Sequence, residues 1–460
     1  MPPSHNEDMQ RHGAVFSQRS KGPDLLERRL LLPGDAHGVK VKHPSLHARK
    51  AIHMPRLSVT CLLLLIPLTA GAATNVGPGD VSGTWTAAGS PYLVQGHLRV
   101  PTAGSLLIEP GVDVRFTGSY VLLVEGALLA AGVPGGEIHF RPDAAGVTWG
   151  HIEFAPDANG SSGLFYCHIE GANALANPAP YNRYGGGVAI GAGTIVGLDH
   201  CVIDGGVAEQ GGGLYSEGEV TLVSCSVRNC QAPGGALQGK GGGLHLVGQA
   251  SVLDCEVTDN EAQFIGGGIY GAQLTGTVFE CRILRNQSSY HGGGIGWESA
   301  APGSSIIGNL IASNEAAGGT RQGGGIYLWY ADGLQITANT IVDNFAGAGA
   351  GVAYGNTTVT FERCLIAFNR GAASADFNDT SNAEYLQTGV WGNTGGDTLL
   401  GDESETLVAD PLFCDGAAAD FTLCADSPCL PLFIGAFGEG CGACATASES
   451  VSWGHVKSRF

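Results

Sequence analysis

The feature that most constrains the fold of this chain is a glycine triplet that returns at a regular interval. The triplets begin at residues 185, 211, 241, 266, 292 and 323, and a Gly-Ala-Gly variant follows at 349. Successive spacings run from 25 to 31 residues. A period of this length is typical of solenoids, in which each repeat is one turn of chain stacked on the previous one. The 74 glycines and the aromatic content of 7% also fit repeats better than ordinary globular domains.

Each repeat carries an alternating apolar run that ends in a Cys or an Asn. The alternation predicts a β-strand, so this residue and the branched residue two positions later share one face, which we assign to the solenoid interior. We expect buried thiols here, since parallel side chains disfavour disulfides. The expected inner stack is Cys201, Cys225, Cys255, Cys281, Asn309, Asn339 and Cys364, with Cys167 in an earlier coil, beside Val257, Ile283, Ile311, Ile341 and Ile366.

A second asparagine ends most of these strands, three residues after the branched residue. Asn tolerates the left-handed backbone conformation of a sharp turn, and stacked amides can hydrogen-bond from coil to coil. We therefore expect a corner stack, after which the glycine triplet allows close backbone approach on entry to the next strand. Its members are Asn260, Asn286, Asn314, Asn344 and Asn369.

Several of these stretches resemble a known family. The segments "CEVTDN…GGGIY", "NLIASN…GGGIY" and "NTIVDN" look like right-handed parallel β-helix repeats of the pectate-lyase-like superfamily, and they are similar to repeats of bacterial polymorphic outer-membrane proteins. Residues 81–116 and 409–429 resemble the opening and closing segments of exported bacterial β-helix proteins. The resemblance implies an all-β fold, a right-handed parallel β-helix with N- and C-terminal caps, and it leaves the function open.

The N-terminal region indicates export. Residues 54–73 have a basic start, an apolar run and a small-residue end, which predicts a signal peptide; a membrane anchor is the alternative, but the run is shorter than the ~20 residues that span a bilayer. We expect residues 1–53 to be a disordered or mis-annotated extension, with the true start at Met54. From Thr74 onward the chain has 13 basic and 37 acidic residues, and this negative net charge makes nucleic acid an unsuitable partner.

The expected organisation then follows from the repeats. Residues 74–150 form an N-terminal cap and the first coils, residues 151–395 form the β-helix repeats, residues 396–444 form a cysteine-rich cap, and residues 445–460 form a tail. Five cysteines crowd into the cap, which predicts disulfides with one cysteine left over; a zinc site at the "CGAC" stretch is the alternative. These cysteines are Cys414, Cys424, Cys429, Cys441 and Cys444.

An aromatic ladder is the first candidate binding site. The residue after "GGGL" or "GGGI" is expected to point outward, so successive coils would stack aromatic rings that suit sugars, although such rings also simply cover β-sheets. The ladder residues are Tyr215, His245, Tyr270 and Tyr327, with Trp329 two residues beyond the last.

A charged column beside the inner cysteines is the second candidate. Adjacent carboxylates on neighbouring coils suit acid-base cleavage of a glycan, or calcium binding beside an arginine, whereas a plain surface charge ladder is the simpler interpretation. If the chain is an enzyme, the expected catalytic residues are Asp254, Glu256, Glu280 and Arg282, with Arg363 further along.

The sequence favours a non-catalytic, secreted or cell-surface β-helix that binds a polysaccharide or a cell-surface glycan. Two alternatives are a polysaccharide lyase or glycoside hydrolase, and an adhesin-like structural protein. No cofactor is evident, calcium binding is left open, and no membrane span is expected after signal cleavage. The oligomeric state is left open.

Overall fold

The structure is a computed structural model that describes residues 73–158, 162–235, 238–317, 321–377 and 381–444. The expected N-terminal extension, the signal peptide up to residue 72 and the C-terminal tail lie outside these residues. The described part is built from β-strands and four single-turn 3-10 helices, η1 (Ala87–Gly89), η2 (Ala174–Ala176), η3 (Gly416–Ala418) and η4 (Leu430–Leu432). None of the helices within these ranges is long and apolar enough to cross a membrane.

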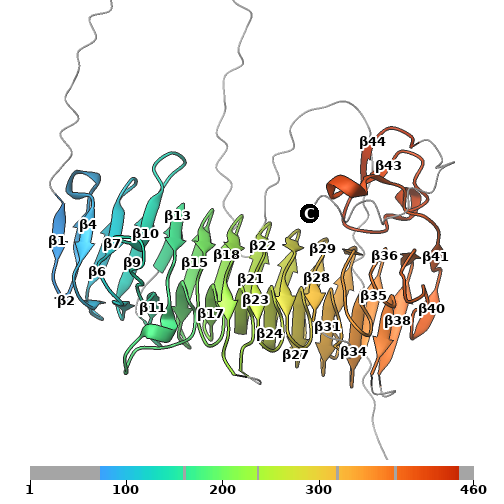
Figure 1. Ribbon diagram of the computed structural model, residues 1–460, viewed down its shortest axis with the longest axis horizontal. Coiled ribbons are helices and arrows are strands. Elements are labelled where there is room, and N and C mark those ends of the chain that lie inside the picture. The colour runs from blue at the N-terminus through green and yellow to red at the C-terminus, as the bar shows by residue number, and fades with distance from the viewer. Residues whose placement is uncertain (1–72, 159–161, 236–237, 318–320, 378–380, 445–460) are drawn as a thin grey trace, which may run out of the picture. The chain divides into compact units, whose positions relative to one another are not determined.

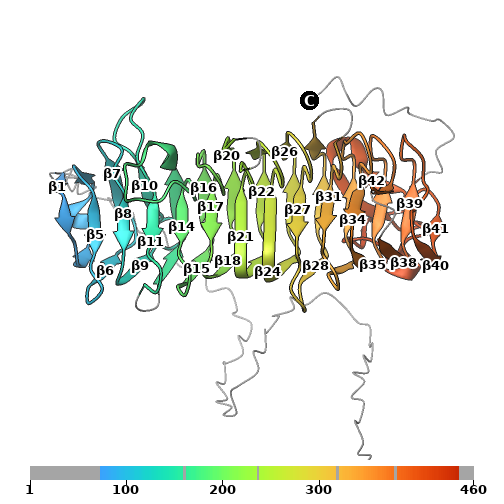
Figure 2. The ribbon, with the colours of Figure 1, turned by 90° about the horizontal axis from the view of Figure 1, so that it is seen from below.

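The strands form a parallel β-helix. Strands of the solenoid pair in parallel with their equivalents in neighbouring coils, so the sheets run along one axis from β1 to β41 (Figures 1 and 2). One sheet, called sheet A here, has fourteen strands. Another has 23 strands and consists of two ribbons, B1 and B2, which join where β21 and β24 run continuously through both. The all-β fold class predicted from the repeat is confirmed.

Sheet A holds the strands that follow the inner Cys or Asn. They are β1 (Thr74–Val76), β4 (Tyr92–Val94), β7 (Asp113–Phe116), β10 (Ile138–Pro142), β13 (Cys167–Glu170), β16 (Val202–Asp204), β19 (Ser226–Arg228), β22 (Glu256–Thr258), β25 (Arg282–Leu284), β29 (Leu310–Ala312), β33 (Thr340–Val342), β36 (Leu365–Ala367), β39 (Gly389–Trp391) and β41 (Leu407–Val408).

Ribbon B1 holds the strands that follow the glycine triplets, and ribbon B2 those that lead into the inner Cys or Asn. The strands of B1 are β2 (Gly79–Asp80), β5 (Leu98–Val100), β8 (Leu122–Val124), β11 (Ile152–Phe154), β14 (Val188–Ile190), β17 (Leu214–Ser216), β27 (Ile295–Glu298), β31 (Ile326–Trp329), β34 (Val352–Gly355) and β37 (Ser374–Asp376). Those of B2 are β3 (Gly83–Trp85), β6 (Ser105–Ile108), β9 (Ala127–Ala131), β12 (Ser162–Phe165), β15 (Ile195–Asp199), β18 (Glu219–Val223), β28 (Ser305–Ile307), β32 (Gln335–Thr337), β35 (Thr358–Glu362), β38 (Asn382–Leu386) and β40 (Asp402–Ser404). The shared strands are β21 (Leu244–Leu253) and β24 (Ile269–Phe279).

Two small sheets complete the fold. Four two-residue strands stack beside the glycine triplets, and three strands form a separate C-terminal sheet. The first set is β20 (Gln231–Ala232), β23 (Glu261–Ala262), β26 (Gln287–Ser288) and β30 (Glu315–Ala316), and the second is β42 (Phe413–Asp415), β43 (Asp420–Cys424) and β44 (Glu439–Cys441).

The solenoid interior contains the predicted inner stack. Each of its cysteines is a free, buried thiol, and the branched residues beside them are also buried. Neighbouring members bridge the coils, because the Cys201 N–H donates to Cys225 Sγ at 3.4 Å and the Asn309 N–H donates to Asn339 Oδ1 at 2.9 Å. Cys and Asn are interchangeable here since both accept this backbone hydrogen bond.

The corner stack is confirmed, but the conformational reason given for it is wrong. The asparagines point inward and are buried; Asn260 Nδ2 donates to Asn286 Oδ1 of the next coil and to Val227 O. The left-handed conformation instead belongs to the residue before each asparagine, such as Asp259 with φ 57°. An inward amide can bridge coils only if the preceding residue makes the turn. This residue is Asp259, Arg285, Ser313, Asp343 or Phe368.

The glycine triplets pack as expected against this corner. A Cβ on Gly268 would lie 2.8 Å from the Gly294 carbonyl oxygen and 2.9 Å from Asn286 Nδ2. The first glycine of the same triplet, Gly266, has φ 72°. The third position of the triplet therefore needs glycine because a side chain would not fit, and the first position needs glycine because its φ is positive.

The C-terminal segment, residues 409–444, does not lie across the end of the solenoid, where a cap is expected. Strands β42–β44 pack on the side of sheet A: Phe421 contacts a cluster that includes Leu284, Leu310 and Val342, and Figure 1 shows the three-stranded sheet beside the C-terminal coils. The Ala436 N–H donates to Thr340 Oγ1 at 2.9 Å. The segment covers a side face because the outward residues of these coils are apolar.

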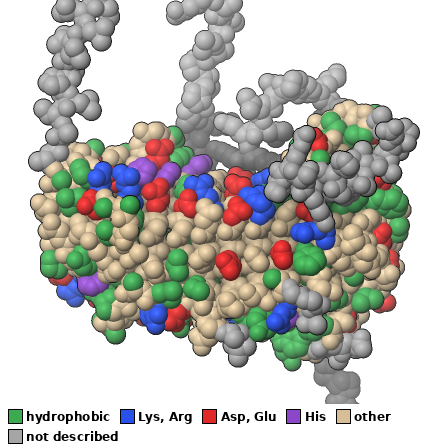
Figure 3. All heavy atoms as spheres, viewed as in Figure 1, with side chains coloured by type: hydrophobic (Ala, Val, Ile, Leu, Met, Phe, Trp, Pro, Cys, Tyr) green, Lys and Arg blue, Asp and Glu red, His purple; other side chains and the backbone are tan. Residues whose placement is uncertain are grey.

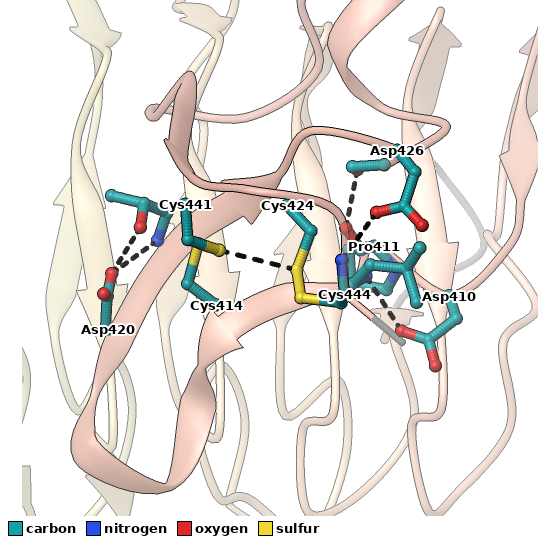
Figure 4. Close-up of a disulfide and its surroundings, with 11 residues drawn as sticks. Asp410, Pro411, Cys414, Asp420, Cys424, Asp426, Cys441 and Cys444 are labelled. Carbon is teal, nitrogen blue, oxygen red and sulfur yellow. Dashed lines mark hydrogen bonds between the residues drawn. A yellow bond between two sulfur atoms is a disulfide. The ribbon is translucent and has the colours of Figure 1, made fainter. Parts of the chain in front are cut away.

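Disulfides cross-link the C-terminal segment, as predicted. Cys414 pairs with Cys441 and Cys424 with Cys444 (Figure 4). Cys429 is buried and free. Both cysteines of the "CGAC" stretch are thus used in disulfides rather than in a zinc site. The two disulfides lie close together, with Cys441 Sγ 3.7 Å from Cys424 Sγ.

Candidate functional site

The predicted aromatic ladder runs along ribbon B1. Tyr215 of β17, His245 of β21 and Tyr270 of β24 are paired in register on consecutive coils. Ring centroids are 4.9 Å apart between Tyr215 and His245 and 4.7 Å apart between His245 and Tyr270. Gly296 occupies the next coil, and Tyr327 of β31 continues the column. The predicted stacking is confirmed, with one gap.

The predicted exposure of this ladder is wrong. The four residues Tyr215, His245, Tyr270 and Tyr327 are only 7%, 4%, 2% and 6% exposed. Ile265 belongs to the same apolar cluster as Tyr270 and Tyr327, and the His291 ring stacks on Tyr327 at 4.6 Å. The segments around the glycine triplets therefore fold over side chains that point away from the solenoid interior.

Only the end of the ladder reaches the surface. Trp329 is partly exposed and stacks on Phe377 with ring centroids 5.2 Å apart. It also meets Tyr330 edge to face at 5.0 Å, and Tyr330 is 53% exposed. Tyr330 was not predicted, because it sits in the left-handed turn after β31, where strand alternation no longer assigns a face.

A charged cluster lies against the buried rings. Lys240 Nζ donates to Tyr270 Oη at 2.7 Å and to Glu298 Oε2 at 2.9 Å, and Tyr270 Oη donates to Glu298. The Lys240 and Glu298 side chains are 21% and 23% exposed, so solvent reaches one side of the cluster. Burial, and then the Glu298 charge, raise the pKa of Tyr270. The phenol is therefore a proton donor that holds its proton at neutral pH.

Two histidines beside this cluster are neutral and incompletely hydrogen-bonded. Burial, with the Lys240 charge as a smaller cause, lowers the pKa of His245 to about 3. Burial, with the Arg321 charge, lowers that of His291 to about 4. Their Nδ1 atoms have no hydrogen-bond partner among the described residues. The sequence offered little sign of the cluster, since Lys240 directly precedes one glycine triplet and Glu298 ends strand β27, which follows another.

The predicted charged column lies on an open surface at the edge of sheet A. Glu256 and Arg282 are cross-strand partners, as expected. Asp254 and Glu280 occupy equivalent left-handed turns of consecutive coils, with φ 51° and 52°, and both are exposed. Asp254 accepts a hydrogen bond from Ser224 Oγ at 3.0 Å. Arg363, with φ 50°, holds the same turn position three coils beyond Glu280.

Sheet A presents two kinds of outer face. From β7 to β22 its outward side chains are mostly polar or charged; this open half is visible in Figure 3 as a band of acidic, basic and histidine side chains. From β29 to β39 most are apolar and buried beneath the C-terminal segment. The outward residues of this covered half include Leu310, Ala312, Thr340, Val342, Leu365 and Ala367.

A shallow groove lies on ribbon B2, across three consecutive coils. Its volume is about 200 Å³, and its floor includes Val220, Ala250 and Gly276. Two columns of polar side chains line it, in register from β18 through β21 to β24. One column is Glu219, Gln249 and Thr275, and the other is Thr221, Ser251 and Thr277. The sequence analysis missed these residues, although polar residues two apart recur at the same place in three successive repeats.

Comparison with known proteins agrees with this fold. Residues 242–410 match a family model described as "Right handed beta helix region". Among solved structures, the chain is similar to the periplasmic alginate epimerase AlgG at 11% identity and a TM-score of 0.40, covering 72% of this chain and 79% of that one. Two mutants of the same epimerase give TM-scores of 0.40 and 0.38, each at 12% identity with the same coverage. No curated protein matches the sequence. The family model supports a right-handed parallel β-helix, as the repeats indicated.

Proposed function

We propose that this chain is an exported β-helix protein that binds a polysaccharide or cell-surface glycan along the outer surface of its solenoid. The observation that carries the proposal is the groove on ribbon B2. Equivalent polar groups recur there at the coil spacing of about 4.8 Å, which is similar to the length of one sugar unit. A linear glycan could thus meet the same set of hydroxyl and amide groups at each successive unit.

The chemistry of the groove favours a neutral glycan. Hydroxyl and amide groups both donate to and accept from sugar hydroxyls, and the Glu219 carboxylate accepts from them. Glu219 is its only charged lining residue, and none is basic. Because the whole chain carries a net charge of −19, a strongly anionic polymer would be repelled from this face.

Export is supported by two independent features. The apolar run within residues 54–73 predicts a signal peptide, and the C-terminal segment holds two disulfides. Disulfides persist in oxidising compartments and are rare in the cytosol. We therefore place the protein outside the cytosol, secreted or at the cell surface.

A panel of neutral and acidic polysaccharides tests the binding proposal. The triple variant Gln249→Ala, Thr275→Val, Thr277→Val should bind the retained neutral polysaccharide at least tenfold more weakly than the wild type. The matched control is Thr358→Val, Thr360→Val, which alters exposed threonines of the same ribbon outside the groove. Equal affinity of the triple variant and the wild type would contradict the assignment.

A second candidate function is polysaccharide cleavage, favoured by the Lys240, Tyr270 and Glu298 cluster. The Tyr270 phenol keeps its proton at neutral pH, so it can donate a hydrogen bond to a bound substrate, and the neighbouring Glu298 carboxylate can accept a proton. New reducing ends or unsaturated uronates would reveal cleavage, and Tyr270→Phe should abolish it without loss of fold. Glu280→Gln in the same assay tests the charged column. A wild-type protein that produces no new ends contradicts both catalytic assignments and leaves the binding proposal intact.

A further inference from the structure

Two histidines and a glutamate converge on the open half of sheet A. His139 of β10 and His168 of β13 are directly paired across the strands, with ring centroids 4.9 Å apart. Glu170 lies two residues after His168 and so points to the same face. One nitrogen from each ring and one carboxylate oxygen lie within 4.8 Å of one another. All three side chains are partly exposed, so a ligand can reach them from solvent.

The charges around this group leave Glu170 available. On one side Asp113 is bound by Arg141, with Nε to Oδ1 at 2.9 Å, and by Arg115 at 2.7 Å. On the other side Asp204 is bound by Arg228 at 2.8 Å. Each of these two aspartates thus forms an ion pair with at least one arginine of this face.

Glu170 has a different partner from these aspartates. Its nearest ion-pair partner is His168, whose Nδ1 lies 3.7 Å from Glu170 Oε1, beyond hydrogen-bond distance. Glu137, in the turn before β10, is close enough to interact electrostatically with both imidazoles. The two rings therefore face two carboxylates, Glu137 and Glu170, that no arginine side chain binds at ion-pair distance within the described residues. Arg141 is close enough to interact electrostatically with Glu170, but it is bound to Asp113.

We propose that His139, His168 and Glu170 form a binding site for a divalent transition-metal ion such as Zn²⁺. Imidazole nitrogens with one carboxylate are ligands of Zn²⁺, Cu²⁺ and related ions, whereas Ca²⁺ and Mg²⁺ prefer sets made only of oxygens. Three protein ligands leave at least one coordination position open to water or to a ligand from solution. Strands fix the positions of all three, so the site needs only side-chain rotation to close on the metal.

The test is a zinc titration of untagged, chelator-treated full-length protein by calorimetry, with Ca²⁺ and Mg²⁺ in excess. His139→Asn and His168→Asn should each lose one tight equivalent of Zn²⁺, and Glu170→Gln should bind it at least tenfold more weakly. His200→Asn is the matched control, because His200 is half exposed on the next coil and pairs with Asp199. The six histidines of residues 1–53 give the same background in every protein.

The outcomes separate a built site from general histidine binding. Unchanged zinc stoichiometry and affinity in His139→Asn and His168→Asn would overturn the proposal, and so would an equal loss in His200→Asn. Glu170→Gln keeps both rings and the shape of the surface, so it remains informative if a histidine variant unfolds. As an independent readout, the electron paramagnetic resonance spectrum of bound Cu²⁺ should show two nitrogen ligands; a single nitrogen would also contradict the site.

Discussion

The open and covered halves of sheet A share one interior and one strand register but carry different outer faces. In the column that runs through Val202, Ser226, Glu256 and Arg282 the residues are at least partly exposed, and at Leu310 the same column becomes apolar and 1% exposed. The change coincides with the C-terminal segment, whose Phe421 packs over β25 to β33. The coil itself is thus uniform, and a segment distant in sequence decides which part of its surface can meet a ligand.

The largest expected effect comes from placing a charge at the same column position in each half. Leu310→Asp should lower the free energy of unfolding by about 4 kcal/mol or release the C-terminal segment, because the carboxylate has no partner under that cover. Val202→Asp should change it by less than about 0.5 kcal/mol. Denaturant unfolding and limited proteolysis measure both effects. Similar losses in the two variants would show that the halves are not covered differently.

Removing a disulfide should loosen the C-terminal segment from the covered half of sheet A and leave the open half intact. Cys414 and Cys441 are separated by 27 residues, and a cross-link across such a loop stabilises by about 3 kcal/mol in the chain-entropy model. The double variant Cys414→Ala, Cys441→Ala should expose the covered half first, seen as faster hydrogen exchange at β29–β36 than at β13–β22. Uniform acceleration along the solenoid would mean that the segment stabilises every coil.

The interior should not distinguish the two halves. Asn260 lies in a coil of the open half and Asn344 in a coil of the covered half, yet each donates to a carbonyl and to the next asparagine at 2.9 to 3.1 Å. Asn260→Ala and Asn344→Ala should therefore each cost about 2 kcal/mol, since both leave buried backbone groups unpaired. Denaturant unfolding measures the costs, and a difference above about 1 kcal/mol would show that the cover also supports the interior.

Residues that face inward could be predicted from sequence because repeat spacing alone determines them. The inner stack was assigned to the interior and Asn260 to a corner stack correctly, since each is fixed by its own coil and the next. The left-handed turn conformation was predicted for Asn260 but belongs to Asp259, the residue before it. The sequence shows that Asn recurs, but it does not show that the Asn amide points inward.

Outward residues were harder to assign, because exposure depends on contacts distant in sequence. Tyr270 points away from the interior as predicted, yet Phe264 and Ile265 belong to the cluster that buries it. Leu310 is covered by Phe421, more than a hundred residues later. The groove on ribbon B2 depends on no such contact. Its polar columns recur at equivalent positions of three successive repeats, but Thr, Ser and Gln are also ordinary residues of exposed strands and so do not mark a site by themselves.

A small effect is also expected from removing an ion pair of the open half. Arg228 binds Asp204 at 2.8 Å, but their side chains are 45% and 29% exposed, so water and salt screen the pair. Arg228→Ala should cost less than about 1 kcal/mol in denaturant unfolding, and the cost should fall further at high salt. A loss of unfolding free energy comparable to that of Leu310→Asp would mean that the ion pairs of the charged face hold the fold together. A small loss is expected if this surface is free to bind ligands.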